Sequence, residues 1–172
     1  MKLLNIFNPI IDIIIKFILR YSQSITFDKI KIIDFQKSDY EIEKSLFENS
    51  LISSLELIKK LDNPNYKKIN KEIKWIIQSK RLFKNKYIEN HKLYSIKYIQ
   101  HWNNQQLVDI YNAGTLIDFV SYQCLISKYK KATNIQQEKI NNICLLKEKR
   151  FYKKVEKLYP QYKGLLINQF IA

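Results

Sequence analysis

Glycine and proline are scarce in this chain: two glycines and three prolines occur among 172 residues. Glycine supplies the left-handed backbone conformations that tight turns require, and a fold of many short strands needs many such turns. Sandwiches, barrels and glycine-loop nucleotide folds are therefore disfavoured, and long helices with few connections are favoured. Because 46% of the residues are hydrophobic, the chain can bury the core of one domain, and disorder of the whole chain is excluded.

The composition is shifted toward residues whose codons consist of A and T. Ile, Lys, Asn, Tyr and Phe together account for 92 of the 172 residues, whereas there are only three arginines. This resembles the style of proteins encoded in protist mitochondrial or plastid genomes, and it predicts a mitochondrial location, in the matrix or associated with the inner membrane. Part of the lysine excess is then mutation bias. The excess of base over acid is less easily explained in that way, because glutamate codons can be AT-rich as well.

The formal net charge of +14 is distributed unevenly along the chain. Residues 1–65 are neutral, residues 66–97 carry +8, residues 98–127 carry −2, and residues 128–163 carry +8. Such segregation indicates a face that meets a polyanion.

Residues 1–24 predict an apolar, amphipathic helix. Asp12, Lys16 and Arg20 recur every four residues and form one narrow polar stripe in an isoleucine-rich segment. We expect this helix to dock on protein. The alternative is membrane contact through residues 3–19, as a short span or an interfacial anchor. A cleaved secretory signal is not expected, because Asp12 interrupts the apolar segment.

The remainder of the chain predicts an all-α fold, with five to six helices in total. Residues 25–37 read as an extended connector, with a single short strand or an extended arm at 25–36, because β-branched residues partly alternate there. A helical domain at 38–160 and an apolar tail at 161–172 follow. We expect the apolar extensions at both ends to need partners, because a lone helical domain rarely leaves such surface in water.

A central antiparallel helix hairpin is predicted from the turn at 62–65, which separates expected helices at 39–61 and 66–89. The second of these helices carries a heptad-like seam with steps of three and four. The seam consists of Tyr66, Ile69, Ile73, Ile76, Lys80, Phe83 and Tyr87. Two further helices are expected, one at 115–131 and one that Asn134 caps and that runs to about residue 159.

Two lysine-rich stripes at helical spacing are the candidate RNA-backbone contacts. They comprise Lys67, Lys71, Lys74 and Arg81 in the first basic block and Lys149, Arg150, Lys153, Lys154 and Lys157 in the second. Lysine ammonium groups neutralise phosphates without reading bases, and three arginines leave little bidentate recognition. The alternative interpretation is a pair of solvated helix faces.

An aromatic series offers candidates for base stacking. Tyr94, Tyr98 and Trp102 lie four residues apart, so one helix face would carry all three rings. Burial in the core is the alternative for such a series.

No motif indicates catalysis. The chain lacks GxGxxG, GxxxxGK[ST], HExxH and GxSxG patterns. His91, His101, Cys124 and Cys144 do not have the spacing of metal ligands. We therefore predict no enzyme activity, no cofactor, no metal site and no small-molecule substrate.

These observations predict a non-catalytic structural subunit of a large organellar assembly. The favoured interpretation is a mitochondrial ribosomal protein that contacts rRNA backbone through its lysine-rich helices and has neighbouring protein subunits as partners. The alternative is an accessory subunit of a mitochondrial respiratory complex or ATP synthase with a short membrane-associated N-terminal helix. The choice depends on whether residues 3–19 enter a bilayer.

Overall fold

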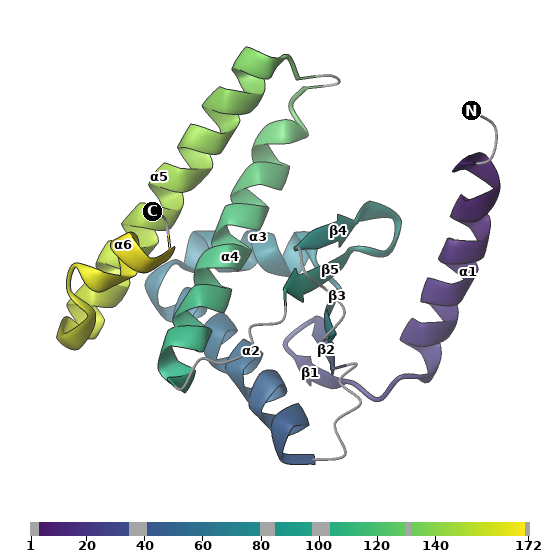
Figure 1. The fold of residues 1–172 in the computed structure, drawn as a ribbon, viewed down its shortest axis with the longest axis horizontal. Coiled ribbons are helices and arrows are strands. Elements are labelled where there is room, and N and C mark those ends of the chain that lie inside the picture. The colour runs from purple at the N-terminus through teal and green to yellow at the C-terminus, as the bar shows by residue number, and fades with distance from the viewer. Residues whose placement is uncertain (1–3, 35–40, 80–84, 98–103, 130–131, 171–172) are drawn as a thin grey trace.

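The computed structural model describes residues 4–34, 41–79, 85–97, 104–129 and 132–170 (Figure 1). The described residues form six α-helices, two short 3₁₀ helices and five strands. The elements are, in chain order, α1 (Leu4–Tyr21), β1 (Ile25–Phe27), β2 (Ile30–Asp34), α2 (Glu41–Leu61), α3 (Asn63–Glu72), β3 (Trp75–Ser79), β4 (Lys86–Ile88), η1 (Glu89–His91), β5 (Leu93–Lys97), α4 (Gln105–Ile126), α5 (Asn134–Leu158), η2 (Pro160–Tyr162) and α6 (Leu165–Phe170).

The strands form one mixed sheet in the order β1-β2-β3-β5-β4, so the predicted all-α fold class is wrong. The three central strands β2, β3 and β5 are parallel, and the edge strands β1 and β4 are antiparallel to their neighbours. The segment at 25–34 is a two-strand hairpin rather than a single strand or an extended arm.

Scarcity of glycine did not exclude this sheet, because other residues make its turns. Asp28, between β1 and β2, and Lys92, before β5, both have φ of +48°, in the left-handed region that glycine usually occupies. Hydrogen bonds from side chains hold both positions: Lys92 Nζ donates to the Lys71 carbonyl, and the Lys59 and Tyr66 side chains donate to Asp28.

The expected helix at 66–89 is also wrong, and with it the central hairpin that it would have formed with the preceding helix. Helix α3 ends at Glu72, and Trp75–Ser79 is the strand β3. Ile73 and Ile76 are both fully buried. They belong to a helix C-cap and to a strand, so their helical spacing is coincidental. Parallel partners on both sides give β3 its hydrogen bonds, and this tertiary pairing outweighs the local pattern.

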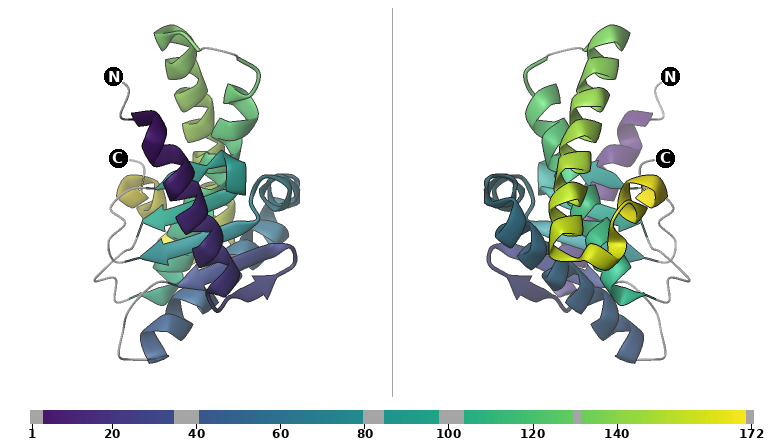
Figure 2. Two further views of the ribbon diagram at one scale, coloured as in Figure 1. Left: turned by 90° about the vertical axis from the view of Figure 1, so that its right-hand side faces the viewer. Right: turned by 90° about the vertical axis from the view of Figure 1, so that its left-hand side faces the viewer.

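The main core lies between one face of the sheet and the helices α2, α3 and α4. Its fully buried side chains include Ile30, Ile32 and Ile76 from the sheet and Leu51, Leu55, Ile58, Ile69, Ile110, Leu116 and Ile117 from the helices. Helix α5 packs on α4, and α1 lies on the opposite side of the strands from α5 (Figure 2).

Helices α4 and α5 form the antiparallel hairpin of the molecule (Figure 1). Helix α4 runs through Gly114, whereas the sequence predicted a helix start at Thr115. A Cβ atom at Gly114 would lie 2.0 Å from Tyr152 Oη, so this glycine permits close helix packing rather than breaking the helix. The last long helix is confirmed at Asn134–Leu158, with Thr133 rather than Asn134 as its cap.

The two ends of the chain differ in how they pack. After α5, the segment that includes α6 folds back onto the core, where Leu166 is fully buried. Helix α1 instead leaves Ile13, Ile14, Phe17 and Tyr21 exposed, each by 51–65% of its surface. None of the helices in the described ranges is long and apolar enough to cross a bilayer.

Candidate nucleic-acid interface

The first basic stripe lies on the exposed side of α3. Tyr66 and Ile69 turn the opposite side of this ten-residue helix into the core, which leaves Lys67 and Lys71 exposed. Lys68, which the sequence analysis did not select, is exposed beside them.

The other two members of that stripe do not share the helix. Lys74 is exposed in the connection between α3 and β3. Arg81 lies outside the described residues.

The second basic stripe occupies the last turns of α5. Arg150, Lys153, Lys154 and Lys157 are exposed, and Lys149 is half-buried. The helical spacing predicted from the sequence holds here, because Phe151, Tyr152 and Val155 fill the core side of α5. These last turns therefore present four cations to solvent.

Lys154 of the second basic stripe contacts the junction that precedes α3. Its Nζ atom donates to the Leu61 carbonyl at 3.1 Å and lies 3.9 Å from Asp62 Oδ2, at the junction between α2 and α3. Positions 93 residues apart in sequence are thereby brought together. Lys59 and Lys60, in the last turn of α2, are exposed at the same junction. We call the surface formed by the exposed basic residues of α2, α3 and α5 near this junction the basic surface. Its members are Lys59, Lys60, Lys67, Lys68, Lys71, Arg150, Lys153, Lys154 and Lys157.

Hydrogen bonds fix the β1–β2 turn against the basic surface. The Tyr66 hydroxyl and Lys59 Nζ both donate to Asp28 Oδ2, the latter at 3.2 Å. The Tyr66 hydrogen bond, and then Lys59, lower the pKa of Asp28, so this carboxylate stays charged and paired. Burial, with the Asp28 contact, raises the pKa of Tyr66 to about 12.

The fixed turn places Lys29 close to α3. Lys29 and Lys67 both line a shallow hollow of about 470 Å³, together with Asp28 and Asn70. Since Asp28 is already paired, two exposed ammonium groups dominate this hollow, which suits a phosphate group. Lys29 was not predicted from the sequence, because residues 1–65 are neutral as a whole and its proximity to α3 arises only in the fold.

The first member of the aromatic series does not lie on a helix face. Tyr94 lies in β5 rather than in a helix, is 3% exposed and stacks on Phe119 with ring centroids 4.4 Å apart. Its ring is therefore part of the core. Tyr98 and Trp102 lie outside the described residues.

The histidine and cysteine residues that the structure describes have separate surroundings. His91 contacts Asp12 of α1, with Nε2 at 2.5 Å from Oδ1. Cys144 is buried in α5 and Cys124 is half-buried in α4, both as free thiols. His101 lies outside the described residues. Within the described ranges, no three His, Cys, Asp or Glu side chains are grouped as ligands of a metal ion would be.

Comparisons of the chain with models of protein families, with curated proteins and with solved structures give no match.

Proposed function

We propose that the protein is a non-catalytic structural subunit of an organellar ribonucleoprotein, the mitochondrial ribosome, and that its basic surface binds rRNA backbone. The contact between Lys154 and the α2–α3 junction carries this proposal. It places the end of α5 beside the start of α3, on which Lys67, Lys68 and Lys71 are exposed. A continuous field of ammonium groups is what the closely spaced phosphates of folded RNA require.

The chemistry of the basic surface favours backbone over base recognition. Eight of its nine members are lysines, which act as point charges and lack the planar fork of arginine. Phosphate contacts of this kind give affinity and position without sequence readout. A protein that holds folded RNA in place needs this and no catalytic group.

The exposed apolar face of α1 favours a subunit that is covered by a partner. Ile13, Ile14, Phe17 and Tyr21 are each more than half exposed, and together they form an apolar side of a helix. This face also supports the second candidate, an accessory subunit of a respiratory complex or ATP synthase, in which α1 would contact lipid. The two candidates differ in what α1 touches.

Sedimentation of the native particle tests the proposal and separates the candidates. A tagged copy of the protein is expressed in the organelle, and a detergent lysate is centrifuged through a sucrose gradient with and without ribonuclease. We expect co-sedimentation with ribosomal subunits and a shift to small particles after ribonuclease treatment. Sedimentation that ribonuclease does not change, together with retention in membranes after alkaline carbonate extraction, would favour the respiratory candidate instead.

A matched pair of tagged variants shows whether the basic surface holds the protein in the particle. Replacing Lys67, Lys68 and Lys71 by glutamine should release the protein from the ribosomal fraction at lower salt than the wild type. The control replaces Lys86, Lys128 and Lys139, which are exposed on β4, after α4 and on the first turns of α5, and loses the same charge. Equal release of the two variants would show that only net charge matters.

A further inference from the structure

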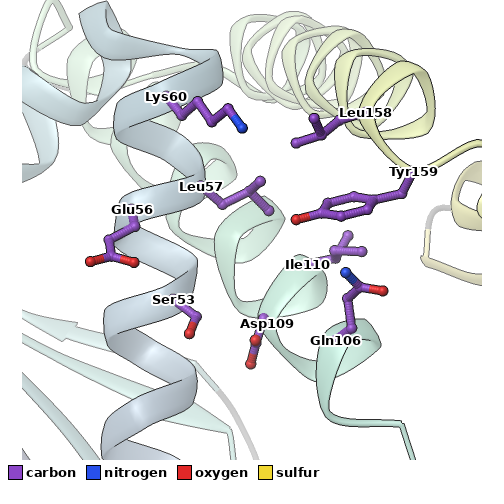
Figure 3. A pocket seen from close by; sticks show the side chains of 9 residues that line it. All are labelled: Ser53, Glu56, Leu57, Lys60, Gln106, Asp109, Ile110, Leu158 and Tyr159. Carbon is purple, nitrogen blue, oxygen red and sulfur yellow. The ribbon is translucent and has the colours of Figure 1, made fainter.

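A cavity of about 290 Å³ opens between α2, the first turns of α4 and the end of α5 (Figure 3). Its volume is at the lower end of the range for small-molecule sites, about 300–1,000 Å³, so it suits one small planar group. Four side chains form its apolar walls. They are Leu57, Ile110, Leu158 and the ring of Tyr159, which extends into the cavity in Figure 3.

Polar groups of defined orientation line the cavity as well. Asp109 Oδ1 accepts hydrogen bonds from Ser50 Oγ at 2.5 Å and from Gln105 Nε2 at 3.1 Å, which hold the carboxyl group in place. Gln106 Oε1 accepts from the Tyr162 hydroxyl at 2.8 Å, so its amide NH₂ is left as the donor. The lining therefore offers a fixed acceptor, Asp109, and a fixed donor, Gln106, three residues apart on α4 and next to the Tyr159 ring.

The cavity adjoins the basic surface. Lys60 belongs to both, and Leu158 and Tyr159 directly follow Lys157 in the chain. Lys154 contacts the carbonyl of Leu61, the residue after Lys60. An RNA strand that followed these cations would pass beside Lys60 at the cavity.

We propose that this cavity binds one unpaired nucleobase that carries an exocyclic amino group, extruded from RNA whose backbone lies on the basic surface. Tyr159 stacks on the base, Asp109 accepts from the amino group, and the Gln106 amide donates to a ring nitrogen or carbonyl. Adenine, cytosine and guanine have such an amino group and uracil does not. The inference rests on the proposed function, because the cations supply most of the affinity.

The test uses short RNA hairpins that differ only at one position of the stem, which is fully paired, has a bulged adenine or has a bulged uracil. We expect the wild-type protein to bind the bulged-adenine hairpin about tenfold more tightly than the fully paired hairpin, which is the scale of one stacked base. The bulged-uracil hairpin should bind less tightly than the bulged-adenine hairpin, because uracil can stack but has no amino group for Asp109. Tyr159→Leu should abolish the gain of the bulged-adenine hairpin over the paired hairpin and leave binding of the paired hairpin unchanged. Tyr129→Leu, which changes an exposed tyrosine after α4, is the control and should retain the preference.

A fluorescent base makes the test independent of any folding defect in the variant. With 2-aminopurine, which carries an exocyclic amino group, at the bulge, binding of wild-type protein should quench its fluorescence as the base stacks on Tyr159. Salt-sensitive binding of all hairpins with equal affinity and no quenching would overturn the nucleobase site and leave the proposed function intact. Absence of salt-sensitive binding to any hairpin would overturn both.

Discussion

Glu148 of α5 should make the stability of the protein depend on pH. Burial between α4 and α5 raises the pKa of this carboxyl from 4.5 to about 7. The hydrogen bond from the Tyr152 hydroxyl, 2.9 Å from Oε1, opposes the rise, and the charge of Asp118 adds to it. Burial also raises the pKa of Asp118. The hairpin thus holds two carboxyl groups that are costly to ionise.

The direction of the effect follows from proton binding. Between pH 4.5 and 7 the folded protein keeps the Glu148 proton and the unfolded chain has lost it, so stability falls as pH rises through this window. The difference of about 2.5 in pKa corresponds to roughly 3 kcal/mol well above pH 7. Because the side chain keeps partial contact with water, screening reduces the expected loss to about 2 kcal/mol.

Urea unfolding of wild type and Glu148→Gln measures this loss. Glutamine is neutral at every pH and can still accept from Tyr152, so the variant should be about 2 kcal/mol more stable than wild type at pH 8.5. At pH 4.5 the two proteins should differ by less than about 0.5 kcal/mol. Glu138→Gln, at an exposed position on the same helix, is the control and should show no such pH-dependent difference.

An equal effect of Glu148→Gln at both pH values would refute the reasoning, because it would show that Glu148 is not held protonated by its surroundings. Asp118→Asn offers a second check. Removing that neighbouring charge should lower the pKa of Glu148, so the fall in stability should end at a lower pH than in the wild type and should be smaller, since Glu148 would then ionise at less cost.

Two further perturbations follow from the packing. Gly114→Ala should destabilise the protein by about 1–2 kcal/mol in urea unfolding. The added methyl group overpacks against the fully buried Tyr152 ring, and this cost exceeds the gain of about 1 kcal/mol in helix propensity. Unchanged or higher stability would show that α4 and α5 are farther apart. Asp12→Asn should weaken the contact of α1 with His91 and so speed proteolytic cleavage in the connection after α1 several-fold. The midpoint of global unfolding should change little. An unchanged cleavage rate would mean that other contacts hold α1.

Helix α5 was predictable because its signal is local. The spacing of Lys149, Lys153 and Lys157, the core side chains between them and the stop at Pro160 all lie within one continuous helix. The stripe of cations on its last turns was therefore placed correctly from the sequence alone.

The strands were harder to predict, because isoleucine is abundant throughout the chain and therefore does not distinguish strands from helices. A strand was expected within 25–36, where β1 and β2 lie, but none was expected at Trp75–Ser79. That segment is short, and its parallel partners β2 and β5 are distant in sequence. The turns beside them use Asp28 and Lys92 where glycine would have been a recognisable signal.

The candidate interface was predictable in part. Charge counts along the chain identified two basic blocks, but not that Lys154 reaches the carbonyl of Leu61. The charge counts did not identify Lys29, Lys59 and Lys60, because the basic and acidic residues of 1–65 are equal in number. The cavity beside Tyr159 combines residues of three helices and leaves no local pattern.

The salt dependence of RNA binding tests the central claim, that the basic stripes of α3 and α5 form one surface for RNA backbone. Filter binding of a structured RNA at several salt concentrations gives the slope of log affinity against log salt, and each neutralised phosphate contributes about 0.7–0.9 to it. We expect a steep slope for the wild type. The slope should fall by a comparable amount in two triple glutamine variants, one at Lys67, Lys68 and Lys71 and the other at Arg150, Lys153 and Lys157. We also expect no reduction in the control variant at Lys86, Lys128 and Lys139. A wild-type slope near zero, or a slope that only one stripe or the control set reduces, would contradict the central claim.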